Sequence, residues 1–185
     1  MSNSLDDAEI HRIVQNVVQN IMGPAVTRES AQPSDKKVVA IGADHGGYEL
    51  KEALKSDIAA LGFEVSDMGT HSKDAVDYPD FAHAVAQAVS TGKAWRGIMI
   101  DGAGIGSCIV ANKVPGVRAG MAYDLSSANN SREHNDTNVL TLGAGLIGVN
   151  LAKQIVKVWL ITEFGGDRHQ KRIDKIKSVE KQYLK

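Results

Sequence analysis

Short apolar runs alternate with helix-like periodicity along residues 37–185. Segments with helix-like patterns predict helices at 49–60, 81–89, 107–112, 126–134, 146–160 and 168–184. Between them, continuous apolar runs predict strands at 38–43, 63–65, 97–100, 117–122 and 139–142. Such alternation is typical of a parallel sheet covered by helices on both faces. We therefore expect a Rossmann-like, doubly wound α/β fold with five parallel strands.

The segment before this alternation has a different pattern. Residues 4–22 carry apolar side chains at spacings of three and four, which predicts a one-sided helix that ends at Gly23-Pro24. The following residues are rich in Pro, Ser and other small or polar types, as linkers are. We expect an amphipathic helix at 1–22, a flexible linker at 23–36 and one main domain at 37–185.

Composition excludes several classes of function. The 21 Lys and Arg against 22 Asp and Glu give a net charge of −1, so the chain lacks the basic footprint of a dedicated nucleic-acid binder. The single cysteine, Cys108, cannot form an intrachain disulfide, and this indicates a reducing compartment. No apolar run approaches the ~20 residues that span a bilayer, and the N-terminus lacks the order of a secretory signal. We expect a cytoplasmic protein that binds neither nucleic acid nor membrane.

A glycine-rich segment directly follows the predicted strand at 97–100. Gly102-Ala103-Gly104-Ile105-Gly106 opens a predicted helix, where flexible backbone lets N–H groups converge on an anion and the helix dipole adds positive potential. The spacing G-x-G-x-G matches neither the dinucleotide fingerprint nor a Walker loop. A tight strand-to-helix turn without a ligand is the alternative interpretation.

Asp101 stands at the tip of the same strand, beside this loop. A carboxylate there could take a proton from a carbon whose neighbouring carbonyl is polarised by the loop amides. Proton transfer between adjacent carbons is the central step of aldose–ketose isomerisation. An aspartate that only caps the following helix is the alternative.

Other polar clusters also follow predicted elements. Asp44 and His45 end the first strand, at the edge where open α/β sheets bind ligands, and residues 131–136 place a histidine among polar groups at a helix end. Arg168 and Arg172 lie four apart on one helical face, which lets two guanidiniums bind one phosphate. Turn chemistry, a solvated helix end and a plain basic helix start are the respective alternatives.

Together these segments resemble the ribose-5-phosphate isomerase B and galactose-6-phosphate isomerase family over residues 37–185. The matching stretches are GADHGGYELKEAL, DYPDFA, GAGIG followed by ANKVPGVRA, SREHNDTNVLTLG and RHQKRID. The resemblance implies an isomerase of a phosphorylated sugar that needs no metal and no cofactor. It also implies a homodimer or homotetramer whose active sites are shared between subunits.

The resemblance also implies roles for single residues. By position, Asp101 would be the base and His134 would open the sugar ring, with His134 and Asn135 supplied by the neighbouring chain. The remaining residues would bind substrate: sugar hydroxyls at Asp44 and Asn135, phosphate at His45, Arg168 and Arg172, the enediolate at Gly102, Gly104, Ile105 and Gly106, and the pocket wall at Tyr78.

The sequence departs from the ribose-phosphate pattern at its centre. Many family members have Cys-Gly-Thr-Gly-Ile-Gly, with the cysteine as base and the threonine assisting, whereas this chain has Asp101 and Ala103. Aspartate at that position resembles one of the two subunit types of galactose-6-phosphate isomerase. Cys108 lies seven residues later in a predicted helix, where we expect a small buried hydrophobe rather than a catalytic thiol.

The leading hypothesis is an aldose–ketose isomerase that acts through an enediolate, with ribose 5-phosphate to ribulose 5-phosphate as its first expected reaction. An isomerase of another pentose or hexose 6-phosphate, and a catalytically weak sugar-phosphate-binding or scaffolding member, are alternatives. A nucleotide-binding flavodoxin-like module shares the fold but leaves His134 without a role.

The N-terminal extension is additional to the family core. Residues 1–22 resemble the encapsulation peptides that direct enzymes into bacterial microcompartments by docking on a shell or cargo protein. A helix that packs on its own oligomer is the alternative. The expected location is the cytoplasm, or a microcompartment within it.

Overall fold

The computed structural model describes residues 36–184. The predicted helix at 1–22 and all but the last residue of the predicted linker lie outside this range. Among the described residues, no helix is both long and apolar enough to cross a membrane.

The described chain alternates strands and helices in the predicted order. The strands are β1 (Val38–Ala43), β2 (Glu64–Asp67), β3 (Arg96–Asp101), β4 (Ala119–Met121) and β5 (Val139–Gly143). The helices are α2 (Tyr48–Ala60), α3 (Tyr78–Ser90), α4 (Ile105–Ala111), α5 (Leu125–Glu133), α6 (Val149–Ile161) and α7 (Asp167–Tyr183). The main departure is β4, which is shorter than the apolar run at 117–122.

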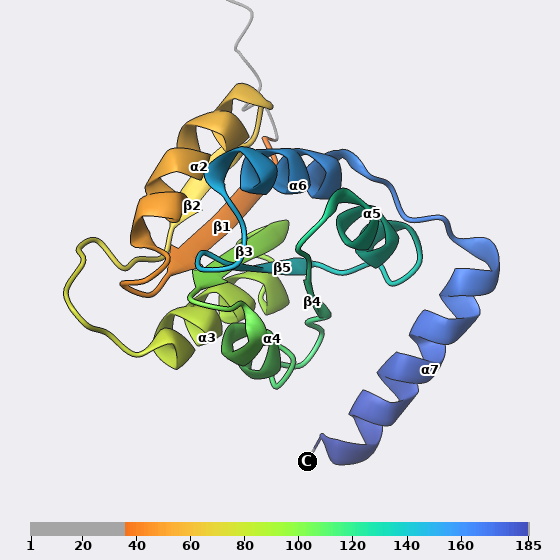
Figure 1. Ribbon diagram of the computed structural model, residues 1–185. Coiled ribbons are helices and arrows are strands. Elements are labelled where there is room, and N and C mark those ends of the chain that lie inside the picture. The colour runs from red at the N-terminus through yellow and green to blue at the C-terminus, as the bar shows by residue number, and fades with distance from the viewer. Residues whose placement is uncertain (1–35, 185) are drawn as a thin grey trace, which may run out of the picture. The chain divides into compact units, whose positions relative to one another are not determined.

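All the strand pairs are parallel, and the strand order is β2-β1-β3-β5-β4 (Figure 1). From β1 the chain goes outward to β2 on one side, and from β3 it goes to β4 at the edge on the other side and then back to β5, which lies between β3 and β4. The order therefore reverses between β1 and β3, which is where doubly wound sheets bind ligands. The predicted fold, a doubly wound sheet of five parallel strands, is confirmed.

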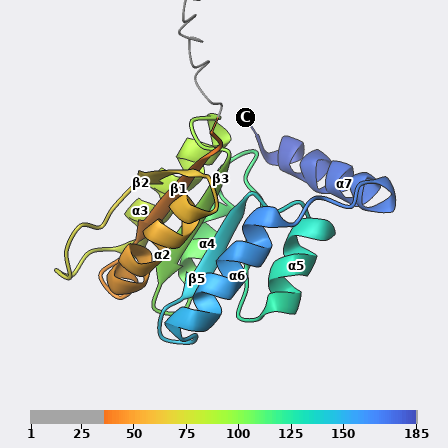
Figure 2. The ribbon, with the colours of Figure 1, turned by 90° about the horizontal axis from the view of Figure 1, so that it is seen from above.

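Helices cover both faces of the sheet because successive side chains of each strand point to opposite faces. Ile41, Ile98 and Leu140 pack in one buried cluster with α2, α5 and α6, whereas Ala40 and Met99 pack in a second cluster with α3 and α4. Figures 1 and 2 show these helices on the two sides of the strands. Both faces are buried, which explains why the strands read as continuous apolar runs.

A buried ion pair links α2 to β2. The Lys51 side chain is fully buried, and its Nζ lies 2.7 and 2.6 Å from the two carboxylate oxygens of Asp67. Lys55 donates to the same carboxylate, as does the backbone N–H of Gly69. Burial acts to raise the pKa of Asp67, but the bonds from Lys51, Lys55 and Gly69 outweigh it and lower that pKa to about 2.

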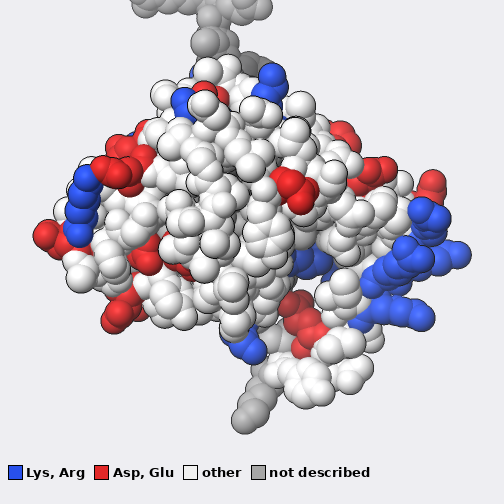
Figure 3. All heavy atoms as spheres, viewed as in Figure 1, with Lys and Arg blue, Asp and Glu red and all other residues white. Residues whose placement is uncertain are grey.

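The last helix, α7, lies beyond the β4 edge of the sheet (Figure 1). Its sequence contains six Lys and Arg against three Asp and Glu, and Figure 3 shows basic side chains gathered over it. His169 and Ile173 are its buried residues, and Glu180 accepts a hydrogen bond of 2.8 Å from the backbone N–H of Gly116. The helix therefore exposes most of its surface, including Arg168 and Arg172.

Candidate active site

The ends of β1 and β3 bring two of the predicted site segments together. Asp44 follows β1, and its carboxylate accepts a 2.9 Å hydrogen bond from the backbone N–H of Gly47. A methyl group added to Gly46 would lie 3.4 Å from the Asp44 carboxylate and 3.9 Å from the backbone nitrogen of Gly102. The Asp44 turn and the Gly102 loop are therefore neighbours at the point where the strand order reverses.

The Asp101 carboxylate is buried beneath the glycine loop. Oδ1 accepts hydrogen bonds from the backbone N–H groups of Ala103, at 2.8 Å, and Gly104. Oδ2 accepts from the backbone N–H of Ser107, at 3.1 Å, and from the Ser107 hydroxyl. A carboxylate has about four lone-pair directions, and all are used here. Asp101 thus makes the capping contacts that were the alternative interpretation, while its position beside the loop is as predicted.

Other amides of the loop stay available. The N–H groups of Gly102, Ile105 and Gly106 make no hydrogen bond within residues 36–184. Gly104 has a φ of +79°, a backbone conformation that residues other than glycine rarely adopt. With this conformation the chain turns into α4. The space over Gly102 is open, because a methyl group added there would meet no atom within 4 Å. The loop can therefore offer backbone donors to an anion above it.

Tyr78 and His45 border the same loop. A methyl group on Gly106 would lie 2.5 Å from Cζ of Tyr78, so only glycine lets this half-exposed ring cover the start of α4. His45 is exposed, and its Nδ1 lies 3.2 Å from both the backbone nitrogen and the carbonyl oxygen of Val76, two residues before Tyr78. The structure thus groups Asp44, His45, Tyr78, Asp101 and the loop around the carboxyl ends of β1 and β3.

The other predicted residues form a second cluster. Asn135 follows His134, whose imidazole stacks on that of His169 with ring centroids 4.2 Å apart and planes 7° from parallel. Arg168 donates through Nε to Nε2 of His169 at 3.3 Å. Burial, together with the neighbouring His134, Arg168 and Arg172, lowers the pKa of His169. His134 therefore packs directly against the start of α7.

Two arginines fix the backbone next to this cluster. Arg118 and Arg132 bind the two oxygens of the Asp136 carboxylate, at 2.7 and 2.8 Å. Arg118 also donates to the carbonyl oxygens of Asn135 and Asp136. Asp136 has φ of +45°, a strained conformation for a residue with a side chain, and these bonds hold it there.

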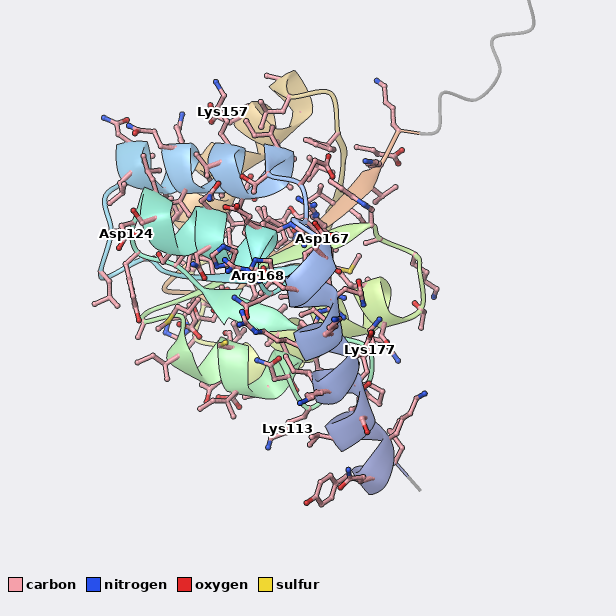
Figure 4. The ribbon with its side chains drawn as sticks, turned by 90° about the vertical axis from the view of Figure 1, so that its right-hand side faces the viewer. Lys113, Asp124, Lys157, Asp167, Arg168 and Lys177 are labelled. Atoms are coloured by element: carbon pink, nitrogen blue, oxygen red, sulfur yellow. The ribbon has the colours of Figure 1, made fainter. Side chains whose placement is uncertain are left out.

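The two clusters lie at opposite ends of the strands, the first at the carboxyl ends and the second at the amino ends. Asp101 ends β3, whereas His134 precedes β5, whose first residue Val139 pairs with Gly97 near the start of β3. Four residue steps of ~3.3 Å each separate Gly97 from Asp101, so the two ends of the strands lie about 13 Å apart. Figure 4 shows Asp124 at one end of α5 and Arg168 near the other. One chain therefore does not bring His134 and the two arginines to Asp101.

Cys108 does not join either cluster in a reactive form. It is partly buried on α4, and burial raises the pKa of its thiol. A raised pKa reduces the thiolate fraction that a nucleophile or base would need. The expectation of a structural role agrees with this environment.

Sequence reasoning missed several residues of the two clusters: Ser107, Arg118, Asn130 and His169. Arg118 and His169 stand inside the stretches ANKVPGVRA and RHQKRID, and Ser107 directly follows the glycine loop. Their roles depend on contacts across the fold that spacing along the chain does not reveal. Within residues 36–184, no group of three or more His, Cys, Asp or Glu side chains is placed to hold a metal ion.

Known proteins resemble this chain over most of its length. The Ribose/Galactose Isomerase family model matches residues 39–176. Ribose-5-phosphate isomerase B of Escherichia coli is 44% identical over 144 residues, covering 78% of this chain and 97% of that protein. D-erythrulose-4-phosphate isomerase of Pectobacterium atrosepticum is 41% identical over 148 residues, covering 78% and 95% respectively.

A solved structure agrees with these relatives. The structure of Clostridium thermocellum ribose-5-phosphate isomerase B superimposes with a TM-score of 0.78 at 49% identity, and the match covers 80% of this chain and 99% of that one. Both the family expected from the sequence and its fold are therefore confirmed. The chain belongs to the ribose/galactose isomerase family of sugar-phosphate isomerases.

Proposed function

We propose that this protein interconverts ribose 5-phosphate and ribulose 5-phosphate. The observation that carries the proposal is the Asp101 carboxylate beside three unbonded amides of the Gly102–Gly106 loop. The names of the Escherichia coli and Clostridium thermocellum relatives support a five-carbon substrate. The Pectobacterium relative is named for a four-carbon sugar phosphate, so chain length within the family varies.

The reaction needs three events that the two clusters can supply. His134 donates its Nε2 proton to the furanose ring oxygen O4 as the C1–O4 bond breaks and C1=O1 forms, and the proton lost from the O1 hydroxyl returns through water to His134, which leaves the open aldehyde and a neutral imidazole. Asp101 takes the proton from C2, and the electrons of that C–H bond form the C1–C2 double bond while negative charge passes to O1, where the loop amides stabilise it. Returning a proton to C1, with transfer of the O2 hydroxyl proton, gives the ketose.

The site is completed by a second copy of the chain. In one subunit the start of β5, which His134 and Asn135 precede, lies about 13 Å along the strands from Asp101, and Arg168 contacts His169 beside His134. In a dimer with two-fold symmetry every contact between the subunits occurs twice, so an interface that brought His134 of one subunit to Asp101 of the other would complete two sites. We propose a homodimer, or a tetramer built from such dimers, with shared active sites. The sugar would contact Asp44 and Asn135, and the phosphate would bind His45, Arg168 and Arg172.

One observation favours a second candidate function. Each oxygen of the Asp101 carboxylate already accepts two hydrogen bonds, so the carboxylate must release a donor before it can take a proton. If none is released, the chain would bind sugar phosphates with little turnover. The Ser107 hydroxyl is the donor that can rotate away, since the other three are backbone N–H groups.

Proton NMR of the purified full-length protein with ribose 5-phosphate, in chelator-treated buffer, tests the proposal. We expect ribulose 5-phosphate to accumulate, and Asp101→Asn to abolish most of this conversion. Saturable binding of ribose 5-phosphate without conversion would establish the second candidate instead. Parallel assays with four- and six-carbon aldose phosphates decide the preferred chain length.

We also propose that residues 1–22 dock the enzyme on a shell or cargo protein of a bacterial microcompartment. The apolar stripe at spacings of three and four supports this proposal, since an exposed stripe needs a partner. Residues 1–22 fused to a fluorescent protein should form puncta in a microcompartment-producing bacterium, and Val14→Glu with Val18→Glu should disperse them. Diffuse fluorescence of the unsubstituted fusion would favour a helix that packs on its own oligomer.

A further inference from the structure

His134 is held by two residues to which sequence reasoning gave no role. Asn130, one helical turn earlier on α5, places its Nδ2 atom 2.8 Å from Nδ1 of His134. His169 covers one face of the His134 ring in the parallel stack. The His134 side chain nevertheless keeps about a third of its surface exposed.

Hydrogen bonding determines which way the Asn130 amide faces. The Asn135 side chain contacts the backbone carbonyl oxygen of Asn130, and because a carbonyl can only accept, the contacting atom is the Nδ2 donor. The same Nδ2 contacts the Asn130 side chain, which must present its Oδ1 there. The Asn130 amide therefore turns its own Nδ2 toward His134, and Nδ1 of His134 is an acceptor.

This contact fixes the tautomer of His134. A neutral imidazole whose Nδ1 accepts a hydrogen bond carries its proton on Nε2. Nε2 lies 3.9 Å from the carboxylate of Glu133, beyond hydrogen-bonding distance, and has no hydrogen-bond partner within residues 36–184, so its proton is available for donation. Protonating a furanose ring oxygen requires such a donor.

A similar argument applies to His169. Arg168 can only donate, so Nε2 of His169 accepts and the proton of the neutral ring lies on Nδ1. That Nδ1 is buried and has no partner among the described residues, and only 7% of the side chain is exposed. A second proton on Nε2 would face the Arg168 guanidinium. A neutral His169 thus supports the His134 ring without placing a positive charge against it.

We propose that Asn130 and His169 are positioning residues for sugar-ring opening: Asn130 holds His134 as the Nε2–H tautomer, and His169 fixes the plane of its ring. The proposal rests on the ring-opening role given to His134 in the proposed function. Neither residue needs to touch the reacting carbons, so both act on ring opening and not on proton transfer between C1 and C2.

Nitrogen NMR of the full-length protein with ¹⁵N-labelled histidine tests the tautomer without any substrate, because protonated and unprotonated ring nitrogens have well-separated shifts. We expect His134 to carry its proton on Nε2. In Asn130→Asp the carboxylate accepts from the ring, so the proton should move to Nδ1. Gln154→Glu makes the same amide-to-carboxylate change on the exposed face of α6 and should leave His134 unaffected. A His134 proton on Nδ1 in the unsubstituted protein, or no response to Asn130→Asp, would overturn the role of Asn130.

Kinetics then separate ring opening from carbon chemistry. Ribose 5-phosphate is a furanose, whereas ribulose 5-phosphate stays open because its O5 is phosphorylated. In Asn130→Asp we expect turnover of ribose 5-phosphate to fall on the order of 10²-fold, while deuterium exchange from D₂O into C1 of ribulose 5-phosphate continues near the rate of the unsubstituted enzyme. Equal loss of both activities would indicate a merely structural effect and contradict the proposal.

The stack is tested by the pair His169→Phe and His169→Leu. Phenylalanine keeps a flat ring beneath His134 and should retain most of the ring-opening activity, whereas leucine should lose it and keep the exchange reaction. Similar behaviour of the two variants would refute the role of His169. If the unsubstituted protein shows neither conversion nor exchange, the proposed function fails, and the nitrogen shifts still decide how His134 is held.

Discussion

Ser107 donates two hydrogen bonds to one oxygen of the Asp101 carboxylate, one from its backbone N–H at 3.1 Å and one from its hydroxyl. The hydroxyl is the one donor of the four to Asp101 that can rotate away without moving the backbone. A carboxylate that must both hold the loop and accept a proton needs such a removable partner. In the proposed reaction, the Ser107 hydroxyl would therefore be the partner that Asp101 releases to take a proton.

Replacing Asp101 by asparagine tests the base directly. Asp101→Asn keeps the shape but removes the basic oxygen, so turnover of ribose 5-phosphate should fall on the order of 10²-fold or more. The amide also places an NH₂ group against N–H donors, which should lower the free energy of unfolding by roughly 1–3 kcal/mol. Steady-state kinetics and urea unfolding measure the two effects separately. Cys108→Ala should keep near-normal turnover, and the reverse pattern would show that the thiol is the base.

Phosphate binding should depend on two exposed arginines of α7. Arg168→Ala and Arg172→Ala should each reduce the affinity for a phosphorylated inhibitor about tenfold or more, because a hydrogen bond to a charged group contributes roughly 1.5–3 kcal/mol. Lys177, further along the same helix (Figure 4), supplies the control, and Lys177→Ala should bind normally. Isothermal titration calorimetry measures the affinities. Unchanged binding in the double arginine variant would contradict the phosphate role.

Mixing two inactive variants should restore activity if sites are shared. An Asp101→Asn chain supplies an intact His134, and a His134→Ala chain supplies an intact Asp101, so their hybrid dimer contains one complete site. After unfolding and refolding of an equal mixture, about a quarter of the sites should be complete. Turnover of the refolded mixture, compared with each variant refolded alone, measures this recovery. No recovery despite exchange of subunits would place the whole site within one chain.

Acid should weaken the fold through Asp67. Its pKa is about 2 in the folded protein against an ordinary value of 3.8, so the ionised group stabilises the fold above pH ~4. This contribution should be lost as the pH falls from about 4 to about 2. At pH 7, Asp67→Asn should lower the free energy of unfolding by about 3 kcal/mol, because Lys51 stays buried without its main partner.

Urea unfolding across this pH range measures the effect. Glu49→Gln is the matched control, because Glu49 pairs with Lys73 at a site where both side chains are mostly exposed. Exposed pairs contribute at most about 1 kcal/mol. A similar loss of stability in both variants would show that burial of Lys51 does not matter.

The sequence predicted the sheet because local composition is sufficient to specify buried parallel strands. Val39 to Ile41 and Ile98 to Ile100 are apolar at consecutive positions since both faces of the sheet are covered. It also placed Asp101 beside the glycine loop, because the two are adjacent in the chain, and glycine at position 104 permits the positive φ with which the turn enters α4. Periodicity and glycine placement act within a few residues, and a sequence displays them directly.

Contacts between distant segments were decided only by tertiary structure. The Asp44 turn meets the Gly102 loop because β1 pairs with β3, and Lys51 meets Asp67 because α2 packs beside β2. The same topology places His134 at the opposite end of the strands from Asp101. There His169 of α7 stacks on the His134 ring. Spacing along a chain carries no information about which strands become neighbours. His134 and Asp101 therefore lie near opposite ends of the strands because α5 runs back along the sheet before β5 begins.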